Sequence, residues 1–134
     1  MTSIDEAREA IYQRWNTEWA SRTPWTFQNE KFTEPESSTW VRISVQNVPA
    51  PTATLGGKNA RRVRRFGKIN IQIFAPKEGG MAQSGTHAQF ALDIFEGEQF
   101  DGVDCNYGVI NELPEEDKWQ PTLVEIDFDY EETK

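Results

Sequence analysis

Residues 62–75 read RVRRFGKINIQIFA, a stretch in which apolar and polar side chains alternate over most of its length. A period of two is typical of a β-strand with one buried and one solvated face. Gly67 falls on the apolar face, where it predicts a bulge or the close approach of another segment. Four β-branched residues share that face: Val63, Ile69, Ile71 and Ile73. We therefore expect a long strand in a sheet that is covered on one side.

Two further stretches show the same alternation, from Trp40 to Val48 and from Val124 to Tyr130. Residues 49–61 connect the first of them to the 62–75 strand, and this connection is longer than the roughly two to five residues of an ordinary hairpin loop. A long, basic hairpin tip of this kind is a candidate interaction arm. Three shorter strands are also expected: Trp25–Gln28, Phe100–Cys105 and Tyr107–Leu113.

Two helices are predicted from apolar residues at three- and four-residue spacing. The first begins near Ser3, which forms a capping-box pattern with Glu6, and ends before Pro24. The second spans Ser84–Phe95 and is terminated by Gly97. Their apolar stripes are Ile4, Ala7, Ile11, Trp15 and Trp19, and Ala88, Ala91, Leu92 and Phe95. The order of elements predicts one α+β domain over residues 1–134, in two layers, with the helices on one face of a largely antiparallel or mixed sheet.

The net charge of −8 conceals an uneven distribution along the chain. Residues 1–92 carry 12 basic and 8 acidic side chains, whereas residues 93–134 carry 2 basic and 14 acidic side chains. The acidic total disfavours sequence-independent DNA binding. The basic and acidic segments can pair within one chain or between copies of the chain, and the sequence leaves both possibilities open.

Six cations within eleven residues form the strongest charge cluster: Lys58, Arg61, Arg62, Arg64, Arg65 and Lys68. Nucleic-acid binding usually combines such charges with several aromatic side chains, and only Phe66 interleaves with them here. A contact with a partner protein or with another copy of the chain is therefore the favoured interpretation. A DNA-binding adaptor that uses the same cations remains an alternative.

Candidate catalytic residues are few. A nucleophilic site needs a histidine beside its nucleophile, and the single histidine, His87, lies in the second predicted helix. The single cysteine, Cys105, is expected to be a small buried side chain. Residues 56–59 lack the spacing of a phosphate-binding loop. No catalytic, cofactor-binding or metal site is predicted, and no apolar run reaches the length of a membrane span.

Acidic side chains on the last predicted strand offer one enzymatic alternative. Glu125, Asp127 and Asp129 share one face of this strand, and Asp101 and Asp104 lie nearby in the sequence. Hard cations bind such clusters, so a metal-dependent nuclease that uses Asp127 and Asp129 is a less favoured hypothesis. Alternating acids are also typical of a solvated strand face, which is the preferred interpretation.

Stretches spread over most of the chain are similar, in order and spacing, to a known family. They are Phe27–Pro35, Trp40–Arg42, Arg65–Pro76, Gly79–Gly80, Trp119–Gln120 and Phe128–Tyr130. Together they resemble a phage-related domain family grouped with the tail terminators, of which the lambda-like minor tail protein U is an example. The resemblance implies a small α+β domain and a virion assembly protein rather than an enzyme, with no catalytic residue or cofactor.

The resemblance further implies a ring, commonly of six subunits, at the head-proximal end of the tail tube. Such a ring stops polymerisation of the tube protein and presents a surface to head-completion proteins. DNA would pass through as cargo, no membrane would be involved, and the protein would belong to the virion tail after assembly in the host cytoplasm. Another head–tail joining or neck protein is the alternative within the same class.

The charge distribution suits a ring, because each copy then offers one patch to a different patch of its neighbour. We expect the basic residues between 58 and 68 to meet acidic residues of the next copy. The surplus acid would line the lumen, where negative walls avoid trapping DNA.

Overall fold

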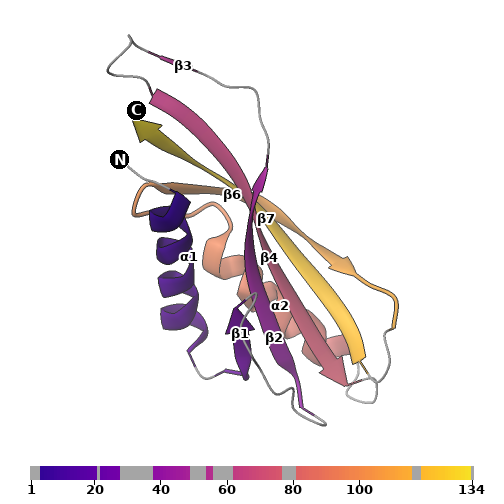
Figure 1. Cartoon of the computed structure of the whole chain (residues 1–134). Helices are drawn as coiled ribbons and strands as arrows, with labels where there is room; N and C mark the ends of the chain where they lie inside the picture. Colours follow the sequence, from indigo (N-terminus) through magenta and orange to yellow (C-terminus); the bar gives the residue numbers. More distant parts are fainter. Residues whose placement is uncertain are drawn as a thin grey trace.

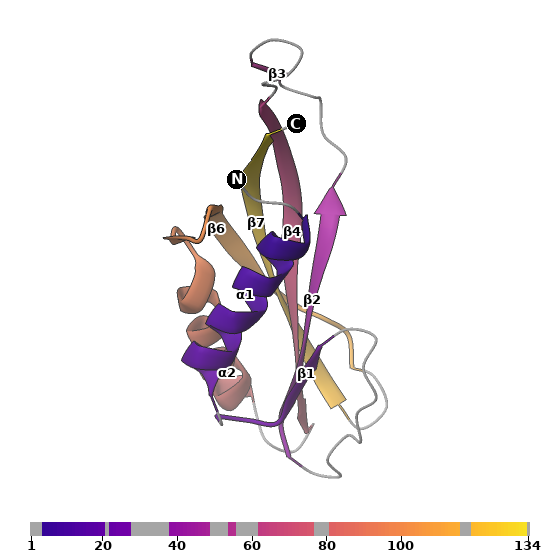
Figure 2. The same ribbon diagram turned by 60° about the vertical axis from the view of Figure 1, so that its left-hand side comes forward.

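The computed structural model describes residues 4–20, 22–27, 38–48, 54–55, 62–76, 81–115 and 119–133. Both helices lie on one face of a twisted sheet, which makes two layers and confirms the predicted α+β class (Figures 1 and 2). The elements are α1 (Ile4–Trp19), β1 (Trp25–Phe27), β2 (Trp40–Val48), β3 (Thr54–Leu55), β4 (Arg62–Pro76), α2 (Met81–Phe95), β5 (Gln99–Phe100), β6 (Val103–Glu112) and β7 (Trp119–Thr133).

The sheet has the strand order β1-β2-β4-β7-β6-β5, and β3 pairs separately with β4. β1 runs parallel to β2, whereas every other described pair is antiparallel, so the sheet is mixed. β4 and β7 form its centre and pair over their full length, from Arg62 opposite Thr133 to Pro76 opposite Trp119. This register places the odd residues of β4 and the even residues of β7 on the helix-covered face.

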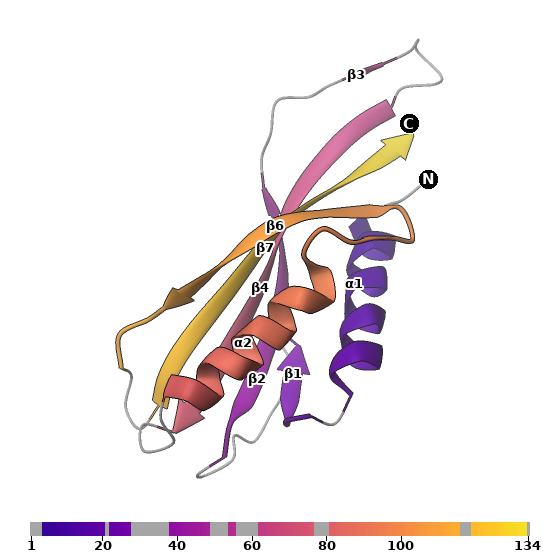
Figure 3. The ribbon, with the colours of Figure 1, turned by 180° about the vertical axis from the view of Figure 1, so that it is seen from behind.

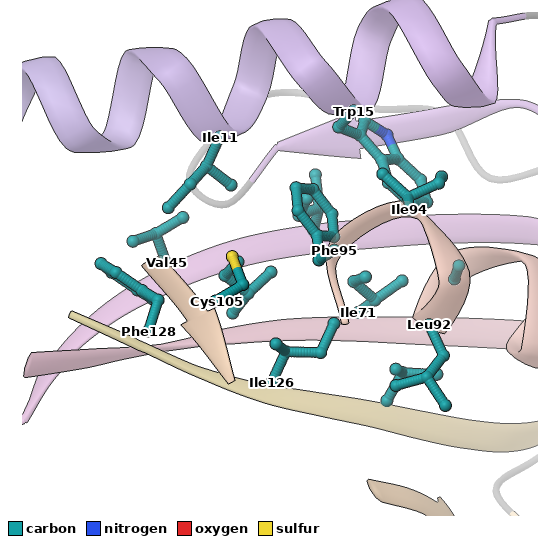
Figure 4. Packing of buried hydrophobic residues seen from close by; sticks show 14 of the residues in the cluster. Ile11, Trp15, Val45, Ile71, Leu92, Ile94, Phe95, Cys105, Ile126 and Phe128 are labelled. Carbon is teal, nitrogen blue, oxygen red and sulfur yellow. The ribbon is translucent and has the colours of Figure 1, made fainter. Parts of the chain in front are cut away.

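The core lies between the sheet and both helices (Figure 4). Ile11 and Trp15 of α1 and Phe95 of α2 point into it, and all three are fully buried. The rings of Trp15 and Trp19 stack with their centroids 4.6 Å apart, and Phe95 lies 6.4 Å from Trp15. Both predicted helical stripes are therefore confirmed as core-facing.

Gly67 lies where β2, β4 and β7 approach one another. The pairing runs without a break from Asn47 through Gly67 to Phe128, so no bulge is present at this position. A methyl group on Gly67 would come within 2.8 Å of the backbone oxygen of Gln46 and still closer to the ring of Phe128. Of the two predicted explanations for Gly67, the structure shows the close approach.

The region from Phe100 to Leu113 differs from the sequence prediction of two short strands. Asp101 and Gly102 have positive φ angles of 44° and 85° and form a two-residue turn between β5 and β6. Such tight hairpin turns need positive φ at both central residues, which an Asp-Gly pair adopts readily. The predicted Phe100–Cys105 strand is therefore wrong at its start.

β6 then continues as one strand with an irregularity between Cys105 and Gly108. The irregularity sets two residues against one of β7, which shifts the alternation and explains why the sequence pattern indicated two separate strands. α2 also begins earlier than expected, at Met81 instead of Ser84. The predicted cap at Ser3 lies outside the described residues.

Candidate functional site

The six cations of the predicted interface are only partly within the described residues. Lys58 and Arg61 lie outside them, and for Arg62 the backbone alone is described. Arg64, Arg65 and Lys68 are all on β4, directly beside the acidic strand β7. Arg64 and Lys68 are on the helix-free face of the sheet, and Arg65 is on the opposite face.

Arg64 is the centre of a charge cluster that spans three strands. Its Nη2 donates a hydrogen bond to Oδ2 of Asp104 on β6 over 3.1 Å and a short one to Oδ1 of Asp129 on β7. Its Nη1 lies 3.6 Å from Oε1 of Glu131. The register causes this arrangement, because Arg64 is opposite Glu131 and Asp104 is opposite Asp129. One guanidinium therefore neutralises part of the charge of three carboxylates.

The other two described cations also have acidic partners in the same chain. Nε and Nη2 of Arg65 both donate to Oε1 of Glu132, over 3.3 and 3.1 Å. Nζ of Lys68 lies 3.6 Å from Oε2 of Glu125. For these three cations the structure shows pairing within the chain, one of the two possibilities that the sequence left open. Their role between copies stays a prediction.

Asp127 and Asp129, the two carboxylates considered for a metal site, lie beside cations of β4. Asp129 has only 12% of its side chain exposed and faces Arg64, while Asp127 is exposed and lies opposite Lys68. Asp101 lies apart from both, in the turn after β5, where it lines an open acidic hollow beside α1. Within the described part of the chain, no three Asp, Glu, His or Cys residues are arranged to hold a metal ion. The geometry around Asp129 suits charge pairing.

Cys105 is buried in the core beneath the helices. Burial is the main reason that the pKa of its thiol is raised to about 12, and the neighbouring carboxylates Asp104, Asp129 and Glu98 add to this, while Arg14 opposes it. The thiol is therefore protonated at neutral pH, as expected of a small buried side chain rather than a nucleophile.

His87 belongs to a small cluster at the surface, between α1 and α2. Its Nδ1 accepts a hydrogen bond from Nε of Arg22 over 3.1 Å, and its ring lies 5.9 Å from that of Trp19. The same guanidinium stacks on Phe90 at 4.1 Å. Partial burial and, to a lesser degree, the charge of Arg22 lower the pKa of His87. The neutral imidazole therefore serves as an acceptor that holds Arg22 in place.

This lowered pKa predicts a pH dependence of stability. Below pH 6.5 the unfolded chain binds a proton at His87 more readily than the folded chain, so stability should fall as the pH decreases from about 6.5 to the folded-state pKa. The difference in unfolding free energy between the wild type and His87→Gln, from urea titrations at pH 7.5 and pH 5.0, isolates this contribution. If the two proteins lose stability in parallel between these pH values, His87 does not cause it.

Comparison with known proteins finds solved structures that are similar over nearly the whole chain. No protein-family model and no curated protein matches the sequence. A solved structure whose description states no function has a TM-score of 0.71 at 18% identity, covering 97% of this chain and 96% of its own. A chain from the virion of a native gene transfer agent particle has a TM-score of 0.50 at 13% identity, covering 95% and 94%. These likenesses show a shared fold.

A second group of aromatic residues, to which the sequence pattern assigned no role, lies on the helix-free face. Trp40, Phe74 and Trp119 pack together there, away from the main core. Arg42 stacks over Trp40 and Phe74 at 5.2 and 5.9 Å. The sequence did indicate on which face they lie, because Trp40 and Phe74 alternate along their strands with the residues that face the helices. That the two side chains pack against each other follows only from the register of β2 on β4, which sets Trp40 opposite Phe74.

No helix among the described residues is long and apolar enough to cross a bilayer.

Proposed function

We propose that this chain is a structural protein of a phage-like virion and that it acts there as a tail terminator. The observation that carries the proposal is the fold likeness to a gene transfer agent virion chain, which extends over 95% of this chain and 94% of the other. The resemblance of Arg65–Pro76 and the flanking stretches to tail terminators supports the narrower role. The ion pair between Arg64 and Asp129 disfavours the metal-dependent nuclease, because that alternative needs the Asp129 carboxylate for a metal ion.

In the proposed role, six copies form a ring that caps the tail tube and binds a head-completion protein on its other side. The role needs neither catalysis nor a cofactor. Arg64, Arg65 and Lys68 have acidic partners in their own chain, and the other cations of the cluster, Lys58, Arg61 and Arg62, have side chains outside the described part of the structure. We propose that these meet acidic residues of the next copy.

Reversing the charge of Arg61 and Arg62 together should lower ring formation at least tenfold at low salt and leave the fold intact. The reason is that two attractive contacts at each interface become repulsive, without any change to the Arg64 cluster. Light scattering and negative-stain electron microscopy, with and without tail tubes, measure the result. The matched control is Arg42→Glu, which reverses an exposed cation at the opposite end of the sheet.

Three outcomes separate the alternatives. Rings that persist in the double variant at low and high salt contradict the arm contact. A protein that binds a head-completion protein but leaves tube growth unchecked is a joining or neck protein instead. Magnesium- or manganese-dependent DNA cleavage that is lost in Asp127→Asn would contradict the structural role altogether.

A further inference from the structure

One margin of the sheet is formed by β6, and its first half is closed (Figure 3). β5 pairs with the first two residues of β6 and with no more. Beyond them, the segment between α2 and β5 covers the outer side of β6. Three hydrogen bonds close the margin as far as Gly108: Cys105 N–H to Glu98 O at 2.9 Å, Gly97 N–H to Asn106 O at 3.3 Å, and Gly108 N–H to Glu96 Oε2 at 3.1 Å.

After Gly108 the margin is open as far as the described residues show, because none of them covers it. The direction of the backbone groups alternates along a strand, and Leu113 N–H points inward to the oxygen of Pro121 at 3.1 Å. Gly108 N–H points outward, so Ile110 and Glu112 also direct their N–H and C=O groups away from β7. Among the described residues, none pairs with Ile110 or Glu112 on that side.

The side chains at this margin are unusually apolar. Three of the four large hydrophobic side chains that are exposed in the described chain belong to β6: Tyr107 (82% exposed) just before Gly108, and Val109 (55%) and Ile110 (38%) in the open half after it. Proteins usually blunt an open strand with lysine, proline or inward charge. Residues 103–112 contain neither lysine nor proline. The open half of β6 therefore has the properties of a strand that accepts another strand.

We propose that residues 109–113 of β6 pair antiparallel with the same residues of a second copy, around a two-fold axis at Asn111. The choice of a second copy rests on charge, because the stretch from Val109 to Leu113 carries one charge only, at Glu112. A symmetric pair of such strands brings no like charges opposite each other in this register, in which each Glu112 faces an Ile110.

The neighbouring symmetric registers are less favourable. With Ile110 on the axis, Glu112 would face Gly108, whose N–H is already bound by Glu96. With Glu112 on the axis, two carboxylates would be directly opposite, which is destabilising. In the register centred on Asn111, the hydrogen bonds between the two copies use only the backbone N–H and C=O groups of Ile110 and Glu112, which point away from β7. This register also sets Val109 opposite Leu113.

A two-fold contact closes at two copies, whereas a ring needs two different patches on each copy. The proposed pairing is therefore additional to the ring and does not depend on the proposed function. A contact of five residues on each strand buries little area, so we expect a weak, concentration-dependent association.

Disulfide formation in full-length Asn111→Cys tests the proposal. Residues on the axis that face each other in a non-hydrogen-bonded pair have Cα atoms about 4.5 Å apart, within the range of a disulfide. Cys105 does not compete, because it is buried. The matched control is Asn106→Cys on the same strand, whose copies would lie roughly 30 Å apart in this register. Dimer formation under mild oxidation should be at least tenfold faster for Asn111→Cys.

Charge variants of Ile110 in the Asn111→Cys background sharpen the test. Ile110→Glu would face Glu112 of the second copy and should slow cross-linking at least tenfold, whereas Ile110→Lys would face it with opposite charge and should preserve cross-linking. Circular dichroism verifies that both variants are folded. Equal rates for Asn111→Cys and Asn106→Cys, or equal losses in the two Ile110 variants, would overturn the proposal. Because ring formation is measured separately by light scattering, either result leaves the tail-terminator proposal standing.

Discussion

Gly67→Ala is expected to lower the free energy of unfolding by about 3 kcal/mol, the upper part of the range for overpacking in a closely packed interior. The added methyl group would come within 2.8 Å of a backbone oxygen of β2, which cannot move without breaking the β2–β4 pairing, and would overlap the ring of Phe128. Both neighbours therefore have to shift in the centre of the sheet. Urea unfolding followed by tryptophan fluorescence measures the loss.

Gly85→Ala is the matched control, because it adds the same methyl group on the exposed surface of α2. Nothing lies within 4 Å of that position, so the substitution should stabilise the protein by roughly 0.5–1 kcal/mol through helix propensity. A Gly67→Ala protein as stable as the wild type would show that β2, β4 and β7 do not approach as closely as described.

Arg64→Met is expected to lower the free energy of unfolding by about 2 kcal/mol. Methionine keeps much of the length of the side chain but removes the cation that Asp104, Asp129 and Glu131 share. Removing one partner of a fully buried ion pair costs roughly 3–5 kcal/mol, and we expect less here because Arg64 is 37% exposed and solvent screens the remaining charges. Chemical denaturation measures the loss, which should shrink as added salt screens the repulsion between the carboxylates.

The double variant Arg64→Met with Asp129→Asn provides the control. Asparagine removes the least exposed of the three carboxylates, so it should restore at least half of the lost stability if repulsion causes the loss. No recovery would show that Arg64 acts through packing alone. A folded Arg64→Met protein that no longer forms rings would show that this guanidinium also contacts a neighbouring copy, as the charge pattern of the sequence predicts.

The elements were predictable where a local pattern decides them. The alternation in β4 and β7 identifies which of their side chains are buried, and so does the helical spacing that includes Ile11 and Trp15 in α1 and Phe95 in α2. The reason is that side-chain direction follows from the periodicity of one segment. The pattern became misleading at β6, where the irregularity after Cys105 shifts the alternation and made one strand resemble two.

The candidate site was predictable only as a list of charges. The sequence determined that cations are concentrated on β4 and carboxylates on β7, and that Glu125, Asp127 and Asp129 share one face of β7. Only the tertiary structure decided that Arg64 meets Asp129, 65 residues away, and that no described strand pairs with the outer side of β6 after Gly108. The physical reason is that strand order and register depend on contacts between distant segments, whereas the alternation within a strand does not.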